Sequence, residues 1–434
     1  MNEVAVGILG LALVLTLFLT GIELGFAMAL VGFLGFSYIV SVKAALNLLA
    51  KDIFDVFANY GFTVIPLFVL MGQIAFNAGI AKRLYDAAYR FIGHVPGGLA
   101  MATVGGATAF GTITGSAPAT AATFASVAVP EMDRYGYSKR LSTGVVSIGG
   151  TLGSLIPPSV TLIVFGMITE QSIGKLFLAA FFPGLIISIF FIIVIYGWCK
   201  MNPQIGPKGE KSSWKERISS LQEVIWVLII FILMIGGLTK GIFTPTEAGS
   251  IGAFAVLLLS VIKGDINFKG FIKSVAESLR TACMVLMLIA GSTILGHFIA
   301  VTKIPMLAAD WIMQLPFPHA FTMVLVLLIY LIGGSFIDDL AFMVLATPIF
   351  YPVILKLGFD PIWFGVILHI FVMIGVVIPP VAINVFVVKN ITKVPFGVIY
   401  SGVYPFLISL LVGAALLFLF PQIALFLPSR LMVY

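Results

Sequence analysis

The sequence predicts an all-α polytopic membrane protein built from two inverted repeats, each with a re-entrant helical hairpin and a proline-broken helix. Of its 434 residues, 60% are hydrophobic and only 10% are charged, and the mean hydropathy is +1.15. An ordinary soluble domain carries roughly 25% charged residues. A soluble globular protein, a disordered chain, a disulfide scaffold and a nucleic-acid-binding protein are therefore excluded, and the main surroundings of the chain are the lipid bilayer.

Continuous apolar runs predict the ordinary spanning helices, because a span needs about 20 apolar residues. No Lys or Arg precedes the first run, so the cationic start of a secretory signal is missing and this run is taken as a span. The predicted spans are 4–20, 24–42, 55–79, 176–199, 222–240, 246–263, 278–300 and 397–420.

Four further apolar segments are interrupted. Pro-Pro pairs lie within 141–169 and 361–389, which predicts broken helices. The segments 97–131 and 319–354 are punctuated by Gly, Pro and polar residues. Each is too long for one helix and too broken for two full spans, so we expect re-entrant hairpins.

The basic residues predict the orientation in the membrane. With the N-terminus outside and both hairpins returning to the side they enter, 17 of the 24 Lys and Arg residues fall in cytoplasmic segments and 7 outside. A single crossing by 97–131 would place the basic segments 82–90 and 134–140 on opposite faces, against the positive-inside rule. The charges therefore favour the hairpin.

A repeat relates the two halves. An offset of 222 residues superposes five Gly and Pro positions in one register, and the polar stretch 200–220 lies near the chain midpoint. We therefore expect a first repeat over 1–199, a cytoplasmic linker over 200–220 and a second repeat over 221–434. In the first repeat 4–79 would be scaffold helices, and in the second 222–300. The matched positions are Gly111 with Gly333, Pro130 with Pro352, Gly153 with Gly375, Pro157 with Pro379 and Pro158 with Pro380.

The two proline breaks predict cation sites. Proline lacks an N–H and clashes with the carbonyl four residues earlier, so the carbonyls of Gly153, Ser154, Gly375 and Val376 should be released. A free carbonyl at membrane depth must face protein, water or a cation. Broken helices at the midplane of inverted repeats coordinate ions in secondary transporters. Helix kinks satisfied by neighbouring helices are the alternative.

The hairpin tips predict a place for a substrate next to these ions. The first contains Thr114, Gly115 and Ser116, and the second runs from Gly333 to Asp338 and Asp339. Helix N-termini favour anions and C-terminal carbonyls favour cations. Intramembrane carboxylates are functional by default, although an aspartate can also cap a helix. Of the two neighbours, only one can face the tip, and we expect Asp338 to matter more.

The motifs GSAPATAATFASVAVPEM, LIPPSVTLIVFGMITEQSIGKLF, PIFYPVILKLGFDPIWFGV and IPPVAINVFVV resemble the large membrane subunit of tripartite ATP-independent periplasmic (TRAP) transporters, the DctM/SiaM-like permeases. The resemblance covers most of both halves. It implies an elevator-type secondary transporter in the bacterial inner membrane that takes up a small organic acid with Na⁺. It also implies a small four-helix membrane subunit and a periplasmic substrate-binding protein. No organic cofactor and no enzyme activity are expected.

The resemblance also assigns site residues. The first tip of the family falls on Gly115 and Ser116, and its second on Asp338. Where the family commonly has Thr before the second Pro-Pro, this chain has Ile378, so the second cation site lacks a hydroxyl ligand. The expected Na⁺ ligands are Gly115, Ser116, Gly153, Ser154, Gly333, Asp338, Gly375, Val376 and Ile378. The expected substrate contacts are Thr114, Ser116, Ser159, Asp338 and Asn384.

Three other functions are compatible with parts of this pattern. A self-sufficient Na⁺/anion symporter of similar inverted-repeat fold would transport without a receptor. A passive channel would show flux independent of a Na⁺ gradient. An intramembrane aspartyl hydrolase would use Asp338 and Asp339, but adjacent residues point in different directions and cannot share a proton as a facing dyad does.

The charge distribution predicts the accessibility of two positions. In a variant without Cys199 and Cys283, a cysteine replacing Ser138 should react with a membrane-impermeant thiol reagent only from the cytoplasm. A cysteine replacing Lys356 should react only from outside. Labelling of position 138 from the periplasmic side would contradict the re-entrant hairpin at 97–131.

Overall fold

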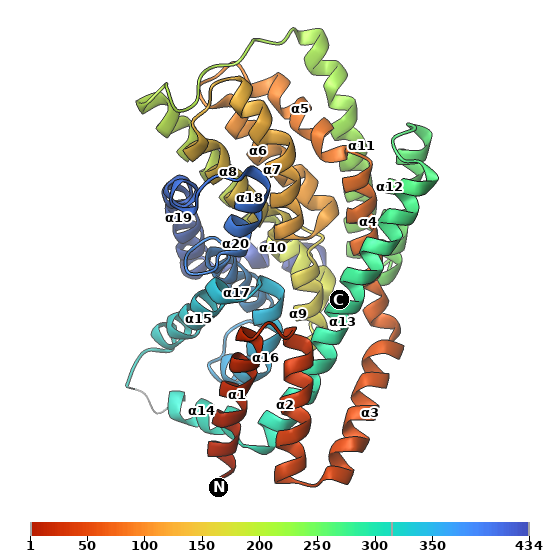
Figure 1. Cartoon of the computed structure of the whole chain (residues 1–434), viewed down its shortest axis with the longest axis vertical. Coiled ribbons are helices and arrows are strands. Elements are labelled where there is room, and N and C mark those ends of the chain that lie inside the picture. Colours follow the sequence, from red (N-terminus) through yellow and green to blue (C-terminus); the bar gives the residue numbers. More distant parts are fainter. Residues whose placement is uncertain (1, 314–315, 433–434) are drawn as a thin grey trace.

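The computed structural model describes residues 2–313 and 316–432, and within these ranges it is helical throughout, with twenty α-helices, one short 3₁₀ helix and no strand (Figure 1). Eight helices are long and apolar enough to cross a membrane, or nine when the bent pair α8 and α9 is taken as one span. The predicted all-α membrane class is confirmed.

The first half begins with two apolar helices, and its last helix ends at residue 201. Its elements are α1 (Glu3–Leu19), α2 (Leu24–Ile39), α3 (Val42–Ala58), the 3₁₀ helix η1 (Tyr60–Thr63), α4 (Val64–Asn77), α5 (Ile80–Ile92), α6 (Gly98–Thr114), α7 (Ala117–Arg134), α8 (Lys139–Leu155), α9 (Val160–Ile168) and α10 (Ile173–Met201).

The second half follows a similar order after a short non-helical connection. Its elements are α11 (Trp214–Thr239), α12 (Pro245–Ile262), α13 (Phe268–Val301), α14 (Ile304–Met313), α15 (His319–Phe336), α16 (Asp339–Lys356), α17 (Pro361–Gly375), α18 (Ile383–Thr392), α19 (Phe396–Leu419) and α20 (Gln422–Leu431).

Several boundaries differ from the sequence-based expectation. The run 55–79 is not one helix, because α3 ends at Ala58 and the Asn59 side chain accepts a hydrogen bond from Gly61 N–H at 2.7 Å. The last residues of the linker 200–220 already belong to α11, whose first turn is closed by a capping box of Ser213 and Glu216. Helix α13 begins ten residues before the expected span 278–300.

Each interrupted segment forms a pair of helices. The chain turns between α6 and α7 at Gly115 and Ser116, and between α15 and α16 at Ile337 and Asp338. Helices α8 and α9 are bent by 41° around Pro157 and Pro158, and α17 and α18 flank the second Pro-Pro. Figure 1 places α6 and α7 in the upper part of the molecule and α14 and α16 in the lower part.

The second helix of each half packs on a helix of the other half. Helix α2 lies against α13, and α12 lies against α4. The first pair approaches closely: a Cβ at Gly25 would lie 2.9 Å from Met287 O, and one at Gly32 would lie 2.7 Å from Leu295 N. Small residues permit such contact between membrane helices. These crossings join the two halves beside the hairpin tips.

The crossing of α2 and α13 leaves no space for a side chain at Gly291. A Cβ added there would collide with the carbonyl oxygen of Gly25. We expect Gly291→Ala to lower the free energy of unfolding by about 1–3 kcal/mol through overpacking. The control is Gly236→Ala in α11, where a Cβ meets nothing within 4 Å. It should be neutral or stabilising by up to about 1 kcal/mol, because alanine is the better helix former. Melting temperatures of the purified variants decide this, and equal behaviour would contradict the close packing.

Candidate functional site

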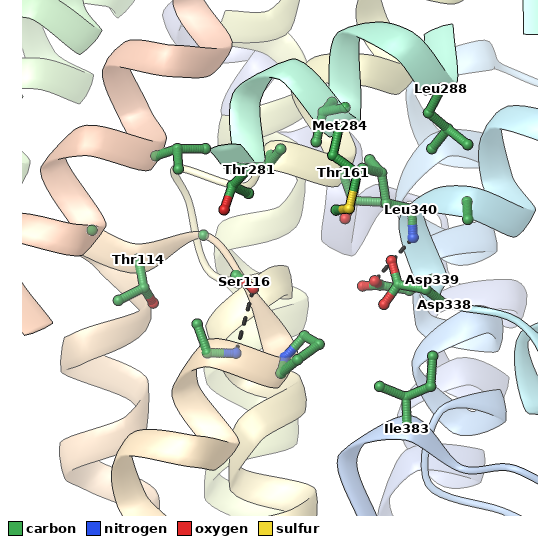
Figure 2. A pocket seen from close by; sticks show the side chains of 18 of the residues that line it. Thr114, Ser116, Thr161, Thr281, Met284, Leu288, Asp338, Asp339, Leu340 and Ile383 are labelled. Atoms are coloured by element: carbon green, nitrogen blue, oxygen red, sulfur yellow. Dashed lines mark hydrogen bonds between the residues drawn. The ribbon is translucent and has the colours of Figure 1, made fainter. Parts of the chain in front are cut away.

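A cavity of about 730 Å³ lies between the two hairpin tips and helices α2, α4 and α13. Figure 2 shows Thr114 and Ser116 on one side, Asp338 and Asp339 on the other, and Thr281, Met284 and Leu288 along α13. Thr161 of α9 lines the cavity between the tips. Segments from both halves of the chain therefore form one site, and its volume is large enough to hold a small solute.

The first tip is a tight turn held against the first proline break. Gly115 has φ +61°, and a Cβ there would lie 2.7 Å from Pro158 O, so this position requires glycine. Its carbonyl accepts a hydrogen bond from Val160 N–H at 3.3 Å. Ser116 begins α7 as its N-cap, accepting a bond from Ala119 N–H at 3.5 Å. The tip and the break thus form one unit.

The second tip contacts the second break in a similar way. Ser335 O accepts bonds from Val381 N–H at 3.0 Å and Ala382 N–H at 3.3 Å. Gly375 packs on the backbone of Gly334, where a Cβ would lie 2.6 Å from the Gly334 carbonyl carbon. Each half therefore joins its hairpin tip to its own broken helix through backbone hydrogen bonds.

The carbonyls that precede the two Pro-Pro pairs differ in the hydrogen bonds that they accept. In the second, the carbonyl of Gly375 accepts a bond from Ile378 N–H at 3.2 Å, and that of Val376 accepts one from Asn384 N–H at 3.2 Å. In the first, no backbone N–H of the described chain bonds the carbonyls of Gly153 or Ser154. The carbonyls released by proline therefore stay free of backbone donors only at the first break.

The residues proposed from sequence divide into two groups. Thr114, Gly115, Ser116 and Asp338 line the cavity. The others lie outside its lining, and two of them have other contacts: Ser159 is fully buried and caps α9 through Leu162 N–H, and Asn384 is fully buried and donates to Ser147 O at 3.2 Å. The residues outside the lining are Gly153, Ser154, Ser159, Gly333, Gly375, Val376, Ile378 and Asn384.

Sequence reasoning missed Arg280, the single Lys or Arg among the residues that line the cavity. It lies in α13, one turn before Met284, and it already falls within the expected span 278–300. Arg280 is exposed and makes no ion pair within the described residues. On the same helix, Glu277 accepts a hydrogen bond from Asn77 of α4 at 3.2 Å. A Lys or Arg inside a predicted span was the signal that could have found this residue.

A multi-pass helical membrane protein with a solute-sized cavity between two hairpins is, by architecture, a membrane permease. The chain belongs to the DctM family: residues 11–423 match the family described as tripartite ATP-independent periplasmic transporter, DctM component. The predicted family is confirmed.

Curated relatives and a solved structure agree with this assignment. The chain is 34% identical to the C4-dicarboxylate TRAP transporter large permease DctM of Pseudomonas aeruginosa, over 88% of this chain and 90% of that protein. It is 31% identical to the sialic acid TRAP transporter large permease SiaM of Vibrio cholerae, over 97% and 98%. The YdaH transporter of Alcanivorax borkumensis shares the fold with a TM-score of 0.65 at 14% identity, over 88% and 89%. The chain is therefore a transporter subunit and not an enzyme.

Proposed function

We propose that this chain is the large permease of a TRAP system in a bacterial inner membrane, where it takes up a small organic acid together with Na⁺. The observation that carries the proposal is the cavity itself. It brings two hairpin tips, the helix ends at these tips and a single arginine to one place between the halves. A carboxylate can meet Arg280 and helix N-termini there, while cations can meet acidic side chains and carbonyls.

The nature of the substrate is inferred from the relatives. One is named for C4-dicarboxylates and another for sialic acid, and both kinds of compound carry a carboxylate. The cavity of about 730 Å³ suits molecules of this size. A small organic acid, either a C4-dicarboxylate or a sugar acid, is therefore the proposed cargo.

The proposed mechanism is an elevator with inverted repeats. Two observations support it. Each half runs through a series of helices, a hairpin and then a broken helix, and each half joins its hairpin to its own break. The hairpins and breaks would move as one transport domain against α2, α4, α12 and α13, which contact one another across the halves. The N-terminus would lie in the periplasm and residues 200–220 in the cytoplasm.

The proposed partners follow from the family. A small four-helix membrane subunit would cover part of the exposed apolar surface, and a periplasmic substrate-binding protein would deliver the acid. A self-sufficient Na⁺/anion symporter of similar fold is the alternative, and receptor dependence distinguishes the two.

Reconstitution tests the proposal directly. Proteoliposomes with this chain and its small subunit should accumulate a radiolabelled acid only when a matching receptor and an inward Na⁺ gradient are both present. Uptake that persists without any receptor would favour the self-sufficient symporter. Uptake that persists when K⁺ replaces Na⁺ would contradict Na⁺ coupling.

Arg280 offers a sharper test of the cavity. A charge-assisted hydrogen bond contributes about 1.5–3 kcal/mol, and 1.4 kcal/mol corresponds to about a factor of ten. We therefore expect Arg280→Gln to raise the substrate concentration for half-maximal uptake by at least tenfold, and Arg280→Lys to raise it less.

Lys269→Gln is the matched control. Lys269 is an exposed cation on the same helix that lies outside the cavity lining, so its removal should leave uptake within about twofold of the wild type. Equal effects of the two glutamine variants would show that Arg280 does not contact the substrate.

A further inference from the structure

An exposed arginine at the start of α8 is held in place by two other helices. Arg140 Nε donates a hydrogen bond to Ser401 O of α19 at 2.9 Å. This carbonyl lacks its usual donor within the helix, because Pro405, four residues later, has no N–H group. The guanidinium carbon of Arg140 also lies 5.0 Å from the centre of the Trp198 ring of α10, within the range of a cation–π contact. These two contacts fix the orientation of the guanidinium.

The outer part of this guanidinium has no partner. Arg140 is exposed, and within the described part of the chain it forms no ion pair and its two Nη groups donate no hydrogen bond. The helices behind it are tightly packed, since a Cβ at Gly144 of α8 would collide with the carbonyl group of Gly402 of α19. A fixed guanidinium with both Nη groups free matches two oxygens of one phosphate or carboxylate.

Aromatic rings and a second cation continue from Arg140 along α18 and α19, two helices that lie beside α8 (Figure 1). Lys389 Nζ lies 5.4 Å from the centre of the Phe396 ring. The first and last rings of the row, Phe386 and Tyr404, are 47% and 50% exposed. Exposed rings beside Lys and Arg are typical of the level at which a bilayer meets water. The rings stack with centres 6.1 to 6.4 Å apart, in the order Phe386, Phe396, Tyr400 and Tyr404.

No acidic side chain on these helices opposes the cations. Helices α8, α10, α18 and α19 contain no Asp or Glu. The neighbouring helix α7 carries Glu131 and Asp133, but these are in ion pairs with Arg134 and Lys139. The surface formed by Arg140, Lys389 and the row of rings is therefore positively charged as well as aromatic, and its charge complements an anion at the membrane surface.

We propose that Arg140 and Lys389 bind the phosphate of an anionic phospholipid, whose acyl chains lie along the rings from Phe386 to Tyr404. Basic groups between membrane helices are a recurring site for anionic headgroups. A lipid accounts for the rings as well as for the cations, whereas a free phosphate would leave the rings exposed. In the orientation proposed above, α8 begins and α18 ends at the cytoplasmic face, so the lipid belongs to the cytoplasmic leaflet. It would join helices of both halves.

Lipid-dependent thermal stability tests the site without transport. A ligand that binds only the native state stabilises it, so phosphatidylglycerol added to the purified protein in detergent should raise the melting temperature at lower concentrations than phosphatidylcholine does. We expect Lys389→Gln to raise the phosphatidylglycerol concentration for half-maximal stabilisation about fivefold, the effect of one cation near an anionic lipid. Arg140→Lys should raise it about threefold, because lysine keeps the charge but not the planar pair of donors.

The matched control is Lys215→Gln. Lys215 is an exposed cation in the first turn of α11, outside the row of rings, and its removal should leave the half-maximal phosphatidylglycerol concentration within about twofold of the wild type. Inorganic phosphate over the same concentrations should not stabilise the protein.

Each of the other outcomes overturns the proposal. Equal stabilisation by the two lipids, or equal shifts in Lys389→Gln and Lys215→Gln, would show that Arg140 and Lys389 do not select an anionic lipid. Stabilisation by inorganic phosphate that matches phosphatidylglycerol would make the ligand a soluble anion. Should Arg140→Lys not fold, Lys389→Gln against Lys215→Gln decides. None of these results depends on the proposed Na⁺ coupling or on the substrate.

Discussion

The need to satisfy every backbone polar group in the absence of water governs this structure. In a bilayer an unpaired carbonyl or N–H costs several kcal/mol, yet the chain turns twice and breaks twice within its apolar segments. Backbone groups of each hairpin tip are satisfied by hydrogen bonds to the broken helix of the same half. Val160 N–H donates to Gly115 O in the first half, and Val381 N–H donates to Ser335 O in the second. The cavity lies between these paired turns.

The long apolar elements could be predicted from sequence because hydropathy and proline report directly on them. The two hairpin segments and the two Pro-Pro segments each form a helix pair in the structure. The helices α3, α5 and α14 escaped this reasoning. Lys51 and Asp52 interrupt the apolar run of α3, α5 is amphipathic and rich in charge, and α14 has only ten residues. A hydropathy window detects none of these features, since short or charged helices owe their stability to packing.

Only some residues of the candidate site could be predicted from the sequence. Thr114, Ser116 and Asp338 could be found because each lies at a turn that glycine or proline marks in the sequence. Ser159 has the same local features, but its hydroxyl is used to cap α9 and its side chain is buried away from the cavity. The neighbourhood of Asp339, Ser154 and His369 joins residues up to 215 positions apart, and no local pattern records such tertiary contact. A repeat also implies equal breaks, whereas the backbone bonds differ between them.

The charges that line the cavity relate the binding of the proposed cation, Na⁺, to the binding of the proposed organic acid. Its lining contains four acidic side chains, those of Glu23, Glu277, Asp338 and Asp339, against the one cation Arg280. An anionic substrate entering alone would meet like charges at short range, and such repulsion is strong where water is scarce. The cations of the proposed coupling would lower this repulsion and so favour a carboxylate beside Arg280.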